Sequence, residues 1–204
     1  MRPRASIENA LTVIAARTVS ADAVWLVGGS AGLMLRGIAL PALPRDLDLY
    51  ADTEDAVQLH KRLASYAIDQ PAFSTTAIYE SRLSHYRIED TAVELVGGFV
   101  VQAHKCRYTT QVREQLLPLA ECASHAPQEQ HTAIKLVPLA HELLFNWLRG
   151  REDRVAVVAE AMAADPARHY PALEKLIASN AFNQDAVKRI EASLRSAEGG
   201  SRDG

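Results

Sequence analysis

The sequence predicts an α/β (α+β) fold, a small mixed sheet flanked by helices, followed by a helical C-terminal subdomain. Segments with helical and with strand periodicity alternate up to about residue 96, whereas only helical periodicity follows residue 138. A glycine-rich turn after an apolar run marks an early junction between a strand and a helix. We expect the α/β domain to span residues 1–137, the helical subdomain residues 138–197 and a disordered tail residues 198–204.

The N-terminal elements follow from their periodicity and from turn residues. Ile7, Leu11, Ile14 and Ala15 recur at helical spacing and predict a helix over residues 6–18. The elements expected after it are a strand at 24–27, a helix at 30–37, a strand at 45–51, a helix at 52–66, and strands at 75–79, 85–88 and 91–96. The last two strands are joined by a tight turn at Glu89-Asp90, and Gly97-Gly98 is expected to end the sheet.

The C-terminal part has a mainly helical pattern. Residues 103–130 have no clear periodicity. A strand is expected at 132–137, closed by Pro138, and helices are expected at 139–148, 152–163, 171–179 and 184–197.

The composition excludes several classes of protein. A hydrophobic content of 48% and a net charge of −3 are ordinary for a globular chain and do not indicate a strongly basic nucleic-acid binder. The two cysteines have no metal-ligand spacing and fit a reducing compartment. The N-terminus lacks the apolar core of a signal peptide, and no apolar run reaches the roughly 18 residues of a membrane span. We therefore expect a cytoplasmic protein with no membrane partner.

Asp46 and Asp48 form the strongest candidate site. Residues i and i+2 of a strand point to the same face, so these carboxylates project together while Leu47 and Leu49 enter the core. Two adjacent carboxylates repel each other unless a cation lies between them. Mg²⁺ is the expected occupant, because it prefers oxygen ligands and commonly completes its shell with phosphates.

The turn Gly28-Gly29-Ser30 is expected to bind those phosphates. Backbone N–H groups at the start of a helix lack intrahelical partners and face an anion readily. Glycine allows close approach because it has no Cβ, and Ser30 adds a hydroxyl group. Arg45, directly before the carboxylate pair, is either a salt-bridge partner or a phosphate contact.

This combination of motifs resembles the nucleotidyltransferase superfamily of the polymerase-β type, over roughly residues 20–155. The residues that carry the resemblance are the Val27-Gly28-Gly29-Ser30 turn and the Asp46-Leu47-Asp48-Leu49 strand. The family places a third carboxylate on a later strand, and Glu94 is the residue that matches it here. Within the superfamily the chain looks most like minimal bacterial members, namely abortive-infection toxin-type transferases and, more loosely, antibiotic-modifying transferases.

The resemblance implies a Mg²⁺-dependent enzyme that moves a nucleoside monophosphate from a nucleoside triphosphate to a hydroxyl group and releases pyrophosphate. Asp46, Asp48 and Glu94 would be the catalytic and metal-binding residues, and Gly28, Gly29, Ser30 and Arg45 would contact the nucleotide. The acceptor, a small molecule, a tRNA or a protein, is left open. A toxin-like role would add a small regulator protein as a partner.

Two features keep alternatives open. The toxin-type members carry a helical lysine where this chain has Asn146, and sixteen residues separate Gly29 from Asp46, which is more than usual. A catalytically degenerate, nucleotide-binding or regulatory module is therefore the alternative function. A further alternative is an α/β-hydrolase, because residues 28–32 also match Gly-x-Ser-x-Gly with Ser30 as nucleophile, and Asp153 and His169 could complete its triad.

Four of the seven histidines are not expected to be functional. His85, His104, His131 and His141 have no ligand spacing, and each is interpreted as a surface or core residue.

Overall fold

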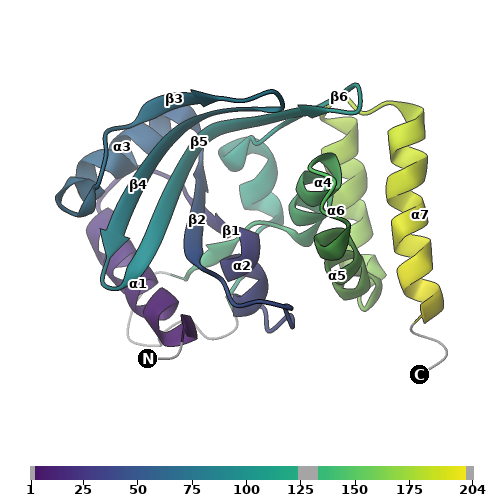
Figure 1. Cartoon of the computed structure of the whole chain (residues 1–204), viewed down its shortest axis with the longest axis horizontal. Coiled ribbons are helices and arrows are strands. Elements are labelled where there is room, and N and C mark those ends of the chain that lie inside the picture. The colour runs from purple at the N-terminus through teal and green to yellow at the C-terminus, as the bar shows by residue number, and fades with distance from the viewer. Residues whose placement is uncertain (1–2, 124–132, 201–204) are drawn as a thin grey trace. The chain divides into compact units, whose positions relative to one another are not determined.

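The computed structural model describes residues 3–123 and 133–200. Contacts divide the chain into two compact units. The first comprises Met1–Phe99 and Thr110–Val137, and the second comprises Val100–Thr109 and Pro138–Gly204. The residues 100–109, which form a hairpin, therefore group with the C-terminal helices. Figure 1 shows the elements of both units.

The first unit is built on a mixed sheet, as the sequence predicts. Its strands are β1 (Leu26–Gly28), β2 (Asp46–Ala51), β3 (Ala72–Thr75), β4 (Tyr79–Ile88), β5 (Thr91–Ala103), β7 (Glu121–Cys122) and β8 (Lys135–Leu136). They lie in the order β3-β4-β5-β2-β1-β8-β7, and β5 also pairs with β6 (Cys106–Thr109) of the second unit. The β1–β2 pair is antiparallel, whereas β2–β5 and β1–β8 are parallel.

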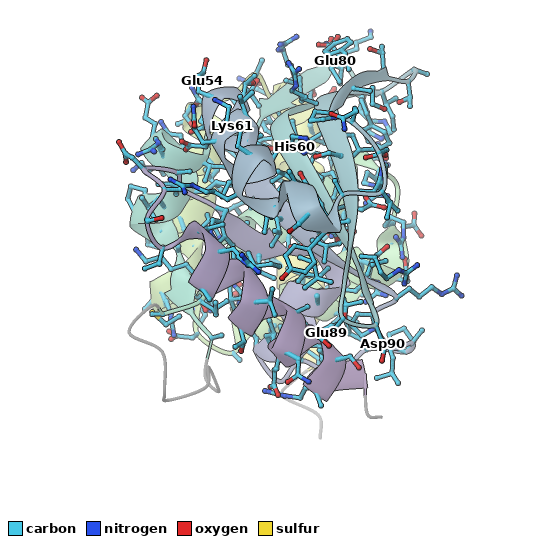
Figure 2. All side chains as sticks on the ribbon, turned by 90° about the vertical axis from the view of Figure 1, so that its left-hand side faces the viewer. Glu54, His60, Lys61, Glu80, Glu89 and Asp90 are labelled. Carbon is cyan, nitrogen blue, oxygen red and sulfur yellow. The ribbon has the colours of Figure 1, made fainter. Side chains whose placement is uncertain are left out.

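Helices cover one face of this sheet. The helical elements of the first unit are α1 (Pro3–Thr18), α2 (Gly29–Leu35), α3 (Thr53–Leu63) and the single turns η1 (Ala64–Tyr66), η2 (Val112–Leu116, a π-helical turn) and η3 (Leu117–Leu119). Figures 1 and 2 show α1 and α3 on the same side of the sheet. In Figure 2, the charged side chains of Glu54 and Lys61 extend outward from α3.

The core lies between these helices and the sheet. Leu47 and Leu49 of β2 are fully buried, and Val93 and Leu95 of β5 are 1% exposed. They pack in one cluster with the apolar face of α1, which includes all four residues expected to share it: Ile7, Leu11, Ile14 and Ala15. Alternation along each strand therefore leaves the even-numbered residues of β2, including Asp46 and Asp48, on the opposite face.

The second unit is helical apart from its hairpin. It contains α4 (Leu139–Leu148), α5 (Glu152–Ala163), α6 (Pro166–Ala178) and α7 (Gln184–Gly200). Helix α4 packs against α5 and α6, and α5 packs against α7. Nearly all of α4 is buried, and its His141 Nδ1 lies 2.8 Å from the hydroxyl of Tyr108 on β6. Burial and the charge of Glu142 raise the pKa of Tyr108.

The expected end of the sheet at Gly97-Gly98 is wrong, because β5 continues to Ala103. The two glycines instead allow helix α3 to approach the strand. A Cβ on Gly97 would lie 2.6 Å from the Cβ of Ala56, and one on Gly98, which has φ +58°, would lie 2.2 Å from Thr53 Oγ1. The glycines thus mark close packing and a local distortion within a strand.

Three boundaries in the C-terminal half differ from expectation. Helix α6 begins at Pro166, since proline is well tolerated at the first position of a helix, and Pro171 lies inside it. Helix α7 continues to Gly200, so residues 198–200 of the expected tail are helical, while residues 201–204 lie outside the described residues. Only residues 135–136 of the strand expected at 132–137 form β8, and Thr132 lies outside the described residues. Among the described residues, no helix is long and apolar enough to cross a membrane.

The close packing at Gly97 gives a test of the fold. Gly97→Ala should lower the free energy of unfolding by about 1–3 kcal/mol, because the added methyl group overlaps Ala56. Thermal denaturation would measure the change. The matched control is Gly199→Ala in α7, where a Cβ meets no atom within 4 Å. It should leave stability unchanged or raise it, and equal losses in both variants would contradict the packing at Gly97.

Candidate functional site

Three neighbouring strands align the glycine turn with two carboxylates in one row across the sheet. Gly28 of β1 lies opposite Asp48 of β2, and Asp48 lies opposite Glu94 of β5. Residues directly opposite each other in paired strands project from the same face of the sheet. Asp46, two positions before Asp48, shares that face, so the register gathers all three acidic residues on the side of the sheet opposite the buried leucines.

The carboxylate of Asp48 lies against the backbone of the glycine turn. A Cβ built on Gly29 would be 2.0 Å from Asp48 Oδ2, and Gly29 has φ +62°, which disfavours other residues. Any other residue at position 29 would therefore strain the backbone and would push the carboxylate of Asp48 aside. The turn and the acidic strand are in contact at this point, as the proposed phosphate and metal sites require.

The other two residues expected to contact the nucleotide adjoin the turn and the acidic strand in the chain. Ser30 is the second residue of α2 and is partly exposed. Arg45 is exposed and directly precedes β2. Gly32 lets α2 pack closely on β1, since a Cβ there would lie 3.3 Å from the carbonyl oxygen of Val27.

Glu94 has a histidine neighbour on the next strand. His85 Nε2 lies 3.9 Å from Glu94 Oε1, and both side chains are a little over one-third exposed, at 35% and 37%. On the other side of the ring, His85 Nδ1 lies 2.5 Å from Asp69 Oδ2. The backbone N–H of His85 also donates to Asp69 Oδ1 at 2.8 Å. Asp69 thus holds the imidazole ring with Nε2 directed toward Glu94.

The same hydrogen bonds affect the ionisation of Asp69. Partial desolvation raises the pKa of this carboxyl group, but hydrogen bonds from the backbone and the ring of His85 outweigh it. The net result is a pKa below the usual value of 3.8. Asp69 therefore remains ionised and able to orient His85 in mildly acidic solution.

The expectation that His85 has no role near the site missed this contact. A signal for it was present in the turn at Glu89-Asp90, which the structure confirms. In a hairpin with a two-residue turn, residues at equal distances before and after the turn lie opposite each other. His85 is four positions before Glu89 and Glu94 is four positions after Asp90, so the two residues are expected to pair. Pairing register, rather than ligand spacing, would have identified the residue.

Several other residues named from the sequence take part in local contacts. Asn146 is buried, and its Nδ2 donates to the backbone oxygen of Glu142 at 2.8 Å. Asp153 Oδ1 lies 3.5 Å from Arg151 Nε, and Asp153 Oδ2 lies 3.7 Å from Arg154 Nε. His131 lies outside the described residues.

The acidic residues fit Mg²⁺ in chemistry and in placement. Over residues 3–123 and 133–200, no three His, Cys, Asp or Glu side chains form a ready-made metal-binding group. Mg²⁺ is nevertheless commonly held by one or two carboxylates together with substrate phosphates and water. Asp46 and Asp48 provide such a pair on one face of a strand, directly beside a turn that glycine leaves open.

Comparison with solved structures identifies the fold. A candidate nucleotidyltransferase from Thermotoga maritima superimposes with a TM-score of 0.60 at 19% sequence identity, over 79% of this chain and 94% of that one. The chain has the nucleotidyltransferase fold. No protein-family model and no curated protein matches the sequence.

An antibiotic-resistance factor and an antibiotic adenylyltransferase superimpose on this chain less well. The antibiotic-resistance factor ANT(2″)-Ia has a TM-score of 0.47 at 12% identity, over 97% of this chain and 96% of that one. The lincosamide antibiotic adenylyltransferase LnuA has a TM-score of 0.43 at 11% identity, over 73% of this chain and 94% of that one.

The contact between Gly29 and Asp48 predicts a specific loss of stability. Gly29→Ala should lower the free energy of unfolding by about 2–4 kcal/mol, because it adds an overlap with Asp48 to the strain of a left-handed backbone. Gly37→Ala is the matched control, since Gly37 has φ +83° and no atom within 4 Å of a Cβ. It should cost only about 1–2 kcal/mol. Equal losses in denaturant unfolding would contradict the added cost of displacing the Asp48 carboxylate.

The ionisation of Asp69 predicts a pH dependence. The pKa of Asp69 is lower in the folded protein than its usual value of 3.8. The ionised carboxylate therefore stabilises the folded protein at pH values above 3.8. This stabilisation is lost as the pH falls through the folded-state pKa. Asp69→Asn lacks the titrating group. The difference in melting temperature between wild type and variant should therefore shrink between pH 5 and pH 2.5. A constant difference over that range would contradict the assignment.

Proposed function

We propose that the protein is a Mg²⁺-dependent nucleotidyltransferase that moves a nucleoside monophosphate from a nucleoside triphosphate to a hydroxyl acceptor. The observation that supports this most is the row formed by Gly28, Asp48 and Glu94 across three paired strands. It brings a turn able to receive phosphates, a carboxylate pair and a third carboxylate onto one face of a fold that nucleotidyltransferases share.

Each residue has a role that follows from its chemistry. Asp46 and Asp48 would hold Mg²⁺, which when bound neutralises charge on the triphosphate. The turn at Gly28–Ser30 would contact the β- and γ-phosphates through backbone N–H groups and the Ser30 hydroxyl. Arg45, exposed beside the acidic strand, would add a positive charge for the phosphates.

Glu94 would act on the acceptor. The acceptor oxygen attacks the α-phosphorus, its proton passes to the carboxylate of Glu94, and the bond from the α-phosphorus to the bridging oxygen breaks with release of pyrophosphate. Glu94 fits the role of base because its carboxylate is partly exposed and lies beside His85. In this proposal the metal ligands are Asp46 and Asp48, and Glu94 would reach a second metal ion only if one binds.

Nucleotide binding gives the first test of this proposal. A ligand that binds only the folded state raises the melting temperature. ATP, GTP, CTP and UTP would each be tested with and without Mg²⁺. At about 100 times the dissociation constant, the preferred nucleotide with Mg²⁺ should add about 2.7 kcal/mol, which corresponds to roughly 5–10 °C for a chain of this length.

The matched controls use acidic residues of the same sheet. Asp46→Asn and Asp48→Asn should abolish the shift while the unliganded protein still melts cooperatively. Asp90→Asn should retain it, because Asp90 lies in the exposed β4–β5 turn (Figure 2). Absence of a shift with all four nucleotides at millimolar concentration would count against the site.

Catalysis is tested separately through Glu94. Glu94→Gln should keep the Mg²⁺-nucleotide melting shift but lower pyrophosphate release by about 10²–10⁴-fold, as expected for loss of a general base. Release would be measured with a panel of acceptors that includes aminoglycosides, lincosamides, tRNA and the protein itself. If wild type binds nucleotide but releases no pyrophosphate with any acceptor, a binding or regulatory module becomes the better account.

A further inference from the structure

The second unit contains two adjoining cavities that no step of the proposed reaction uses. Their volumes are about 460 and 380 Å³, within the range of small-molecule sites. Both are lined by His104, Trp147 and Arg189. The larger cavity extends to Lys105 and to the start of α7, and the smaller one extends along α5 and α7.

Trp147 provides an aromatic surface between the two cavities. Its indole ring is only partly buried at the end of α4. The ring of His104 approaches it edge-on, with 5.2 Å between centroids, and the guanidinium carbon of Arg189 lies 6.0 Å from the indole centroid. A partly exposed tryptophan with a guanidinium group nearby is suited to stacking against a flat heteroaromatic ring.

The hairpin tip that carries His104 and Lys105 has an unusual sequence for its conformation. Both residues have positive φ, 53° and 59°, which matches a two-residue hairpin turn where asparagine and glycine are preferred. Strained residues of this kind concentrate at ligand sites. The tip is also tied to the start of α7, because Asn183 Nδ2 donates to the His104 carbonyl oxygen at 2.9 Å.

The charges around the cavities select among possible ligands. Lys105 and Arg189 are balanced by Asp185 and Glu152. Because the two carboxylates offset the two cations, a phosphate group alone gains little net attraction here. A ligand with a flat ring, hydroxyl groups and one phosphate fits better, since carboxylates accept hydrogen bonds from ribose hydroxyls and the two cations pair with a phosphate.

We propose that these cavities form a second nucleotide site, in which a base stacks on Trp147 and a single phosphate lies between Lys105 and Arg189. The ligand is a nucleoside monophosphate, either free or at the end of an RNA strand. Every residue lining the cavities belongs to the second unit, so this unit alone forms the site, and no residue of the glycine turn or of the acidic strands contributes to it.

Intrinsic fluorescence tests the proposal directly. The chain has two tryptophans, so Trp25→Phe leaves Trp147 as the only indole. With Asp46→Asn and Asp48→Asn added, and with EDTA present, binding in the first unit is removed. Titration with AMP should change the Trp147 emission saturably at millimolar concentration or below, whereas inorganic phosphate alone should not. A five-nucleotide RNA would be titrated in the same way. If AMP binds more tightly, the natural ligand is a free nucleotide, and if the RNA binds more tightly, it is the end of an RNA strand.

Matched variants separate a ligand site from a structural role. Lys105→Ala and Arg189→Ala should each raise the dissociation constant at least tenfold. Lys188→Ala, a neighbouring exposed cation that does not line either cavity, should change it less than twofold. The double variant His104→Asn/Lys105→Gly suits the turn better, so it should keep or raise the melting temperature and still lose binding. No saturable response to AMP or RNA, or an equal effect of Lys188→Ala, would overturn the proposal.

Discussion

Parallel pairing of β2 with β5 sets the position of each carboxylate in the candidate site. A shift of one residue would turn Glu94 to the face that holds the core and would move Val93 and Leu95 out of that core. The buried faces of both strands therefore hold the register, and the register holds Glu94 opposite Asp48. The chemistry on one face of the sheet depends on hydrophobic packing on the other.

Three glycines lie where another part of the chain approaches these strands closely. Gly29 admits the carboxylate of Asp48, Gly97 admits Ala56 of α3, and Gly98 admits Thr53 at the start of the same helix. The first contact joins the turn to the acidic strand, and the other two bring α3 onto β5. The glycines that look like turn signals in the sequence therefore have two different functions, one at the site and one in the core.

The parts of the fold that depend on local pattern could be predicted, and those that depend on tertiary contacts could not. Alternation around Asp46 and Asp48 was sufficient to assign their face, and the resemblance led to Glu94. The continuation of β5 past Gly97 was missed, because its cause is the approach of α3. The contact of His85 with Glu94 was missed too, since it arises from strand register and not from residue spacing.

A crystal structure with Mn²⁺ and a non-hydrolysable nucleoside triphosphate tests the central claim most directly. The metal would be located by its anomalous signal. The account predicts a metal ion about 2.0–2.2 Å from carboxylate oxygens of Asp46 and Asp48, with the β- and γ-phosphates against the backbone of Gly28–Ser30. A triphosphate and metal ion bound elsewhere, with both aspartates free of metal, would contradict it.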